Sequence, residues 1–249
     1  MKRLSVSQET LKLIATVTML IDHIGAVLVY SLYLSAWNAG NYALSNQMAR
    51  IYTSMRIIGR IAFPIYCFLL VEGFHHTRNI RKYITRLAIC MVLAEIPFDL
   101  ALSGYIDWSS SSTMGTLLLG CLMMVGMNCF PGFWKLLAIP PFYGIAELLG
   151  TDYGGKGILL IAMLALTKDL PREKLLRTIG FVICLWFGAT VQVGSVEIPM
   201  ELFGLIGLIP MLLYDGKKLT HNKWIQWSFY LFYPVHLLVL WIIEELLFG

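Results

Sequence analysis

Charged side chains are scarce in this sequence, and no low-complexity linker interrupts it. Aspartate, glutamate, lysine and arginine make up 14% of the 249 residues, whereas hydrophobic residues make up 58%. A soluble globular domain carries about 25% charged residues, so this composition excludes an ordinary soluble domain. It predicts instead a polytopic membrane protein of the all-α class, with residues 1–249 forming one bundle of helices in the lipid bilayer.

Motifs for metal, disulfide or nucleotide binding are also missing. The five cysteines lie in apolar runs without CxxC or metal-ligand spacing, so we interpret them as small buried residues. His75 and His76 are adjacent rather than four apart, and the glycine-rich segment 152–157 lacks the Walker spacing. The net charge of +4 comes from basic residues spread over short connections. The sequence therefore predicts no metal and no nucleic-acid partner.

Long apolar stretches follow one another along the whole chain. A helix that crosses the bilayer needs about 20 residues, and the first stretch alone satisfies this length. The nine predicted spans cover residues 11–34, 51–74, 83–104, 113–130, 133–149, 157–167, 175–191, 199–214 and 224–247. The sixth is short, and its start can be placed as early as Tyr153. The absence of a clear internal repeat weakens the case for a transporter built from inverted repeats.

Lysine and arginine are distributed unevenly between the two sets of connections. The N-terminus and the even-numbered connections hold 15 of the 19 basic residues, and the odd-numbered connections hold only Arg50 and Lys156. The positive-inside rule then places the N-terminus in the cytoplasm and the C-terminus outside. Glu147 and Glu201 fall at the outer ends of their spans. The sequence thus predicts a multi-pass protein of the cell membrane.

Two polar residues, Asp22 and His23, lie in the middle of the first predicted span. An aspartate at the bilayer centre costs on the order of 2.5–3.5 kcal/mol on insertion scales, so such residues are functional candidates. His23 is the candidate general base, because a neutral imidazole can take a proton from a hydroxyl or an amine near neutral pH. Asp22 or Glu95 would orient it. The alternative is a histidine that is simply hydrogen-bonded at a helix interface.

Other charged residues fall within the spans at helical spacing. Arg56 and Arg60 lie four residues apart on one face of the second span, and Glu95 and Asp99 do so on the third. Opposite charges at this depth should meet, so we expect the arginines to pair with these carboxylates. His236 in the last span would line the same cavity. The alternative interpretation treats the set as structural ion pairs that hold the helices together.

Cations near the cytoplasmic side suggest a binding site for an anionic donor. Lys12 lies eleven residues before His23, about three helical turns, and therefore on the same helix face. Arg78 and Arg81 belong to a basic run that could bind phosphates. The alternative is that all three are the basic residues that positive-inside topology requires.

Several sequence blocks resemble a known family. They are Asp-His-Ile-Gly at 22–25 with Lys12 ahead of it, Arg-Ile-Ile-Gly-Arg-Ile-Ala-Phe-Pro at 56–64, Val-Glu-Gly-Phe at 71–74, Glu-Ile-Pro-Phe-Asp at 95–99, Asp-Tyr-Gly at 152–154 with Gly157, and Phe-Tyr-Pro-Val-His at 232–236. The blocks and their order resemble the TraX family, named for the conjugation protein that acetylates F-pilin. The resemblance covers nearly the whole chain.

The resemblance implies an acetyltransferase. The TraX family is distantly similar to membrane acyltransferases of the acyltransferase-3 type, which carry a basic residue shortly before a histidine in the first span. Lys12 and His23 match that pattern, with ten residues between them. The implied reaction moves an acetyl group from cytoplasmic acetyl-CoA, the co-substrate, to an acceptor in or across the membrane. The acceptor would be a pilin-like peptide N-terminus or an envelope glycan.

These observations assign three groups of candidate residues. The catalytic candidates are His23, Asp22, Glu95 and Asp99; the substrate-binding candidates are Arg56, Arg60, His236, Asp152 and Tyr153; the cofactor-binding candidates are Lys12, Arg78 and Arg81. The arginines would stabilise the acyl oxyanion or hold the acceptor. Two other functions use the same residues differently: a proton-coupled transporter or flippase, and a structural partner in a conjugation or secretion assembly.

Overall fold

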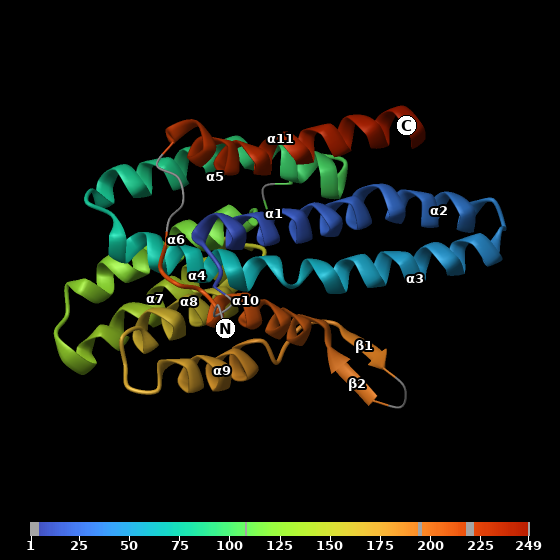
Figure 1. Cartoon of the computed structure of the whole chain (residues 1–249). Coiled ribbons are helices and arrows are strands. Elements are labelled where there is room, and N and C mark those ends of the chain that lie inside the picture. Colours follow the sequence, from blue (N-terminus) through green and yellow to red (C-terminus); the bar gives the residue numbers. More distant parts are fainter. Residues whose placement is uncertain (1–4, 108, 194–195, 218–221, 249) are drawn as a thin grey trace.

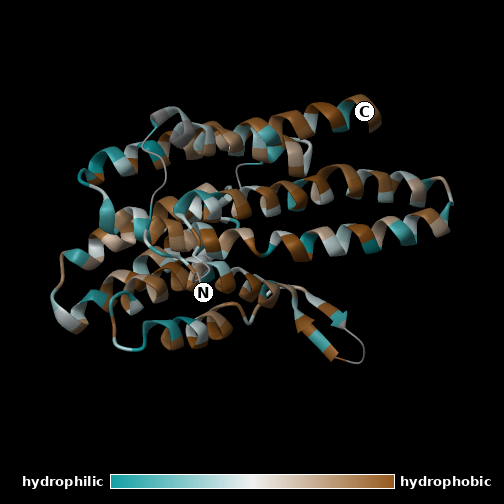
Figure 2. Ribbon diagram, viewed as in Figure 1, coloured by the Kyte–Doolittle hydropathy of each residue, from teal (hydrophilic) through white to brown (hydrophobic). Residues whose placement is uncertain are grey.

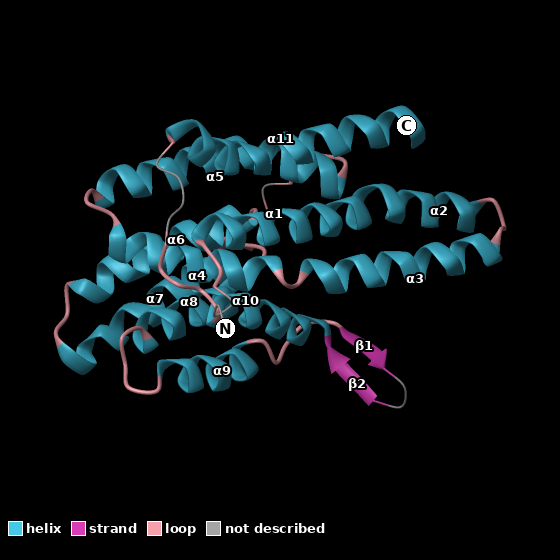
Figure 3. Cartoon of the chain, viewed as in Figure 1, coloured by secondary structure: helices cyan, strands magenta, loops and turns pink. Residues whose placement is uncertain are grey.

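The structure is a computed structural model, and it describes all residues except 1–4, 108, 194–195, 218–221 and 249. Helices dominate it, and the described part holds one hairpin of two short strands (Figure 3). The elements are α1 Gln8–Ile24, the π-helical turn η1 Gly25–Val29, α2 Tyr30–Asn38, α3 Tyr42–Gly59, α4 Ala62–His76, α5 Ile80–Ser103, α6 Thr113–Asn128, η2 Gly132–Ala138, α7 Ile139–Leu148, α8 Gly154–Thr167, α9 Glu173–Cys184, β1 Thr190–Val193, β2 Val196–Pro199, η3 Met200–Gly207, α10 Leu208–Leu212 and α11 Lys223–Phe248. The prediction of a helical bundle is confirmed.

The first three elements form one continuous helical rod of 31 residues, Gln8–Asn38. Ser7 caps its start, because its hydroxyl accepts a hydrogen bond from the Thr10 amide at 3.2 Å. The π-helical turn begins at Gly25, two residues after His23. Such turns are rare inside α-helices and are frequent at functional sites. The rod carries the first predicted span.

α3 and α4 form a second rod, Tyr42–His76, which runs back beside the first (Figure 1). Arg60 and Ile61 separate the two helices as turn residues, because Pro64 has no amide hydrogen to donate to the Arg60 carbonyl. η3 packs against this break. A Cβ atom on Gly204 would lie 3.0 Å from the Arg60 carbonyl oxygen, a contact that η3 could relieve only by moving away by a few tenths of an ångström.

The remaining helices complete the bundle on either side of the two rods. α5 packs along α11, which also contacts α1, whereas α6, α8 and η3 pack against α4. Pro234 within α11 leaves the Tyr230 carbonyl without its helical donor, and the Cys90 thiol of α5 donates to that oxygen at 3.3 Å. α7 and α9 pack against α8 on its other faces.

Three helical stretches of the described chain are long and apolar enough to cross a membrane: Gln8–Asn38, Tyr42–His76 and Trp227–Phe248. They coincide with the first, second and ninth predicted spans, and hydrophobic residues predominate along α1, α2 and α11 (Figure 2). Shorter apolar helices of 10–17 residues include α6 and α8, and each falls short of the usual spanning length of about 20 residues. The count of nine spans and the cytoplasmic N-terminus stay predictions.

The seventh predicted span, 175–191, is wrong at its C-terminal edge. α9 ends at Cys184, and Thr190–Val193 form β1, which pairs antiparallel with β2. Gly188, in the connection between α9 and β1, has a φ of +92°, a conformation that glycine adopts without strain. Three of the four residues in Thr-Val-Gln-Val are β-branched, a composition that favours a strand.

Candidate functional site

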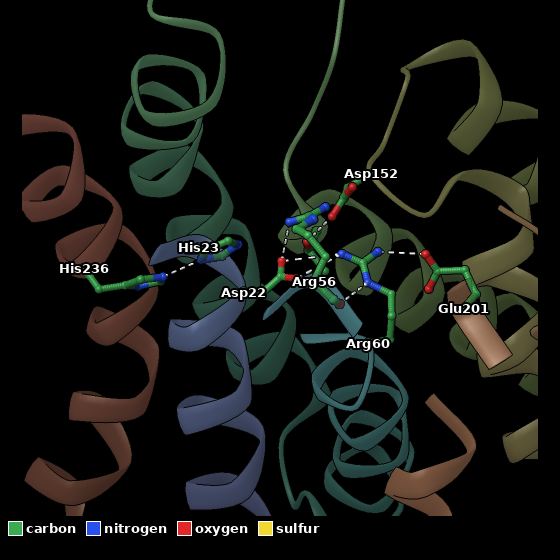
Figure 4. A network of polar contacts seen from close by, with 8 residues as sticks. Asp22, His23, Arg56, Arg60, Asp152, Glu201 and His236 are labelled. Carbon is green, nitrogen blue, oxygen red and sulfur yellow. Dashed lines mark hydrogen bonds and ion pairs between the residues drawn. The ribbon is translucent and has the colours of Figure 1, made fainter. Parts of the chain in front are cut away.

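Asp22 and His23 are consecutive residues near the end of α1, and both are buried. Successive residues of an α-helix point about 100° apart around its axis. Asp22 therefore faces α3, whereas His23 faces α11 (Figure 4). The two side chains begin two separate polar networks, one of ions and one of imidazoles.

The imidazole network joins α1 to α11. The Nδ1 atom of His23 lies 2.6 Å from Nε2 of His236, and Nδ1 of His236 lies 2.6 Å from the carbonyl oxygen of Phe232. A carbonyl can only accept, so His236 donates from Nδ1 and, when neutral, accepts at Nε2. His23 must then donate from Nδ1, which leaves a lone pair on its own Nε2. Among the described residues, nothing hydrogen-bonds to that nitrogen.

This geometry corrects the prediction that Asp22 or Glu95 orients His23. His236 fixes the ring instead, by a hydrogen bond that also sets the tautomer. Tyr233, one helical turn from His236 on the same side of α11, meets both imidazole rings edge-on, with ring centroids 6.0 Å from His23 and 5.8 Å from His236. Its hydroxyl is buried near Thr113 and makes no hydrogen bond of standard geometry within the described part of the chain.

The ionic network centres on the Asp22 carboxylate. Arg56 Nη1 lies 2.6 Å from Asp22 Oδ2, and Arg60 Nη2 lies 3.2 Å from Asp22 Oδ1. Arg60 also donates from Nη1 to Glu201 Oε1 at 2.7 Å and from Nε to the Arg56 carbonyl at 3.2 Å. Every nitrogen of the Arg60 guanidinium thus has a partner, so Arg60 links α1, α3 and η3.

Arg56 is engaged less completely than Arg60. Among the described residues its side chain hydrogen-bonds to Asp22 alone, and 24% of that side chain is exposed, compared with 11% for Arg60. A guanidinium has five N–H donors, so Arg56 keeps donors for a further partner. Asp152 lies on the same side of the cluster as the Arg56 guanidinium (Figure 4).

Gly59 allows α1 and α3 to approach at the ionic network. A Cβ atom on Gly59 would lie 1.9 Å from Asp22 Oδ1 and 2.3 Å from Asp22 Cβ. The Asp22 carboxylate therefore rests directly on the α3 backbone, between Arg56 and Arg60. A side chain at position 59 would displace it from both arginines.

The segment before α8 supplies Asp152 and Tyr153. The Tyr153 ring stacks on Phe63 with ring centroids 3.5 Å apart, and its hydroxyl is within electrostatic reach of Arg60. Asp152 Oδ2 accepts a hydrogen bond from the Thr113 hydroxyl at 2.7 Å, and its charge acts on Asp22 and Glu201. The structure thus brings both residues to the cluster, together with Asp22, His23, Arg56, Arg60 and His236.

Glu95 and Asp99 do not pair with the arginines, contrary to the prediction. Glu95 accepts hydrogen bonds from the Ser111 hydroxyl at 2.9 Å and from the amide and hydroxyl of Ser112. Asp99 Oδ2 accepts from the Asp107 amide at 3.1 Å. The physical reason is that α5 packs against α11 and α6, whereas the arginines lie on α3 beside α1.

The carboxylates of α5 instead hold the loop that precedes α6. In that loop the hydroxyl and amide of Ser109 donate to Asp107, and these bonds hold the pKa of the Asp107 carboxyl below its ordinary value. Ser111 pairs in turn with the segment that carries Asp152, since the Asp152 amide donates to the Ser111 carbonyl at 2.9 Å. Glu95 and Asp99 are therefore positioned to support the site rather than to form it.

The three predicted cofactor-binding cations lie away from the cluster. Lys12 and Arg78 line a cavity of about 650 Å³, whereas the exposed Arg81 does not. In the part of the chain that the structure describes, no group of three or more histidine, cysteine, aspartate or glutamate residues is placed to hold a metal ion.

Two residues of the cluster, Glu201 and Tyr233, were absent from the predicted site. The position of Glu201 at the start of an apolar stretch suggested only the membrane edge. Tyr233 lies inside the Phe-Tyr-Pro-Val-His block, one helical turn before His236, which is a signal that could have included it. No spacing rule could have brought Glu201 to Arg60, because 141 residues separate them.

The chain forms an apolar helical bundle, and some of its helices are long enough to span a membrane. Imidazoles, guanidinium groups and carboxylates gather inside the bundle. These features define a membrane protein with a polar site in its interior. The family model described as "TraX protein" matches residues 7–244. The chain therefore belongs to the TraX family.

A curated relative supports the same placement. The chain is 29% identical over 249 residues to the probable fimbrial assembly protein FimC, serogroup H1, of Dichelobacter nodosus, covering 92% of each chain. No solved structure matches this chain.

Proposed function

We propose that the protein is a membrane-embedded acyltransferase that moves an acetyl group from cytoplasmic acetyl-CoA to an acceptor. One observation carries the proposal: a buried imidazole, His23, is held by a second imidazole so that its Nε2 lone pair is uncommitted. A neutral histidine in this state is suited to act as a general base. A histidine with both ring nitrogens hydrogen-bonded would have no lone pair free to take a proton.

The proposed step has a simple proton balance. Nε2 of His23 takes the proton from the acceptor hydroxyl or amine as the acceptor attacks the thioester carbonyl. The resulting imidazolium still donates from Nδ1 to His236, which stabilises it without further movement. When the carbon–sulfur bond breaks, the thiolate of CoA recovers that proton. The products are the acetylated acceptor and free CoA.

Charge develops on the carbonyl oxygen in this step, and Arg56 is the proposed group that stabilises it. Each guanidinium nitrogen of Arg60 already has a partner in Asp22, Glu201 or the Arg56 carbonyl, so its proposed role is to hold the cluster together. Arg56 retains donors and partial exposure, and it lies within electrostatic reach of His23. A preformed hydrogen-bond donor at an oxyanion typically lowers the activation free energy by about 2.7–4 kcal/mol.

The name of the relative favours a protein acceptor, and it also supports a second candidate function. A fimbrial assembly protein would act on, or alongside, the subunits of a surface fibre. On this basis we propose a pilin-like peptide as the acceptor, with an envelope glycan as the other class. The second candidate is a structural partner of such an assembly, without catalysis.

Mass spectrometry of membrane peptides and envelope glycans tests the proposal. Cells that produce the wild-type protein should contain a species heavier by one acetyl group, and this species should be missing without the gene and in His23→Ala cells. The matched control is His75→Ala, because His75 is exposed and lies outside both the cluster and the cavity. Unchanged peptides and glycans, with fibre assembly lost only when the whole gene is deleted, would favour the structural partner.

A further inference from the structure

A cavity of about 650 Å³ lies between α1, α4, α5, α6 and α11, on the side of α1 that carries Lys12. This volume falls within the range of small-molecule and cofactor sites, about 300–1,000 Å³. One end is bordered by Thr77 and Arg78 in the connection between α4 and α5. The other end is bordered by Tyr66 and by Met114 in the first turn of α6.

The cavity is charged with one sign only. Its walls hold three permanent cations, Lys12, Arg78 and Arg86, and the described residues that line it include no carboxylate. Like charges that line one cavity repel one another, so an anion inside it would be stabilised. The rest of the wall is mostly apolar and aromatic.

Arg86 is the one of these cations with a buried donor that no described residue satisfies. Its Nε is buried and has no hydrogen-bond partner in the described chain, and its guanidinium makes no ion pair there. Its recorded contact is with the face of the Tyr83 ring, 5.9 Å from guanidinium carbon to centroid. A buried guanidinium donor that is left unsatisfied carries a desolvation penalty, which an anionic ligand in the cavity would remove.

The inner end of the cavity leads toward the polar cluster. The Tyr66 hydroxyl lies 3.2 Å from that of Thr16, which stands on α1 between Lys12 and His23. Met114 follows Thr113, whose hydroxyl binds Asp152. A ligand that fills the cavity would therefore reach from the cations at one end to the neighbourhood of His23 at the other.

We infer that this cavity is the donor site and that Arg86 is a phosphate-binding residue within it. The ligand class is a thioester on a long arm with phosphate groups, as in acetyl-CoA. Lys12, Arg78 and Arg86 contact the phosphates, the apolar wall holds the arm, and the thioester lies at the Tyr66 end. This inference rests on the proposed function, which it deepens by locating the donor.

Binding of CoA to the purified full-length protein in nanodiscs tests this inference, since CoA lacks the acetyl group and cannot react. Arg86→Gln should weaken CoA binding about tenfold or more, because a hydrogen bond to a charged partner is lost. Arg78→Gln, at an exposed position, should weaken binding without endangering the fold. Lys82→Gln is the matched control: Lys82 lies one turn before Arg86 on α5 and is exposed, and it lies outside the cavity.

Anionic lipid is the other source of phosphate, so binding is compared in phosphatidylglycerol and phosphatidylcholine nanodiscs. Equal CoA binding by wild type and Arg86→Gln, or no CoA binding at all, overturns the inference. So does an Arg86→Gln effect on bound phosphatidylglycerol but not on CoA. Failure of the proposed function is separate: it would appear as CoA binding that depends on Arg86, together with peptides and glycans that carry no acetyl group from the wild-type protein.

Discussion

The Nδ1 proton of His23 is committed to His236, and the Nδ1 proton of His236 is committed to the Phe232 carbonyl. This chain of donors fixes which nitrogen of His23 can act as a base. Asp22, the adjacent residue, forms ion pairs with Arg56 and Arg60 instead. The proposed base and the ion cluster are therefore separate, although His23 and Asp22 are neighbours in sequence.

His236→Ala tests the role of the second imidazole. The substitution removes the group that fixes the tautomer and ring orientation of His23, so we expect acetyl transfer to fall by a large factor but to remain detectable. His23→Gln should be inactive, because its amide cannot take a proton. Transfer rates in isolated membranes measure both. A His236→Ala protein with no activity beside an active His23→Ala protein would move the base to α11.

Arg60→Ala tests the ion cluster. The substitution leaves Asp22 and Glu201 buried without the partner that links them, and breaking a buried ion pair costs about 3–5 kcal/mol. We expect a clear fall in the melting temperature of the purified protein. Arg50→Ala, at an exposed position of α3, should leave it unchanged. Equal melting temperatures for wild type and Arg60→Ala would contradict the pairing.

At the scale of elements, helical spacing identified faces correctly but not their neighbours. The four-residue spacing placed Arg56 with Arg60 and Glu95 with Asp99, and each pair does act together in the structure. The packing of whole helices decides which two helix faces come into contact. α5 packs against α11 and α6, so its carboxylates do not meet the arginines of α3. The β1–β2 hairpin was missed because the first two residues of β1 were assigned to the seventh predicted span, 175–191, and most of β2 fell in the connection that follows it.

Glu95→Ala tests the support that α5 gives to the loop before α6. Glu95 accepts three hydrogen bonds from Ser111 and Ser112, and Ser111 pairs with the segment of Asp152. Loss of hydrogen bonds to a charged group should speed amide exchange at 109–113 about tenfold or more. Glu245→Ala, at an exposed position of α11, serves as the control. Unchanged exchange at 109–113 would exclude this supporting role.

At the scale of the whole molecule, composition alone was enough to predict a helical bundle, and its three longest apolar stretches are those of the structure. The number of crossings was harder to predict, because helices such as α7 and α9 are too short to span on their own. The site itself gathers residues from α1, α3, η3, α11 and the segment before α8. Most of these residues could be recognised from the sequence, because polar side chains within long apolar runs are energetically unfavourable in a membrane.

Cysteine labelling in intact cells tests the arrangement in the membrane. In a background without the five native cysteines, we expect cysteines at the Asn41 and Ser110 positions to react with an impermeant reagent from outside. Cysteines at the Asn79 and Asn222 positions should react only after the membrane is opened. External labelling at position 79 would reverse the orientation.

The central claim is that His23 is the base of an acetyl transfer, and one measurement tests it most directly. Membranes with wild-type or His23→Ala protein, matched for amount and insertion, are given acetyl-CoA with a labelled acetyl group, and label in membrane peptides and glycans is counted. Loss of a general base typically costs about 10²–10⁴ in rate, so the account predicts label with wild type and none detectable with His23→Ala. Equal labelling by both proteins would contradict it.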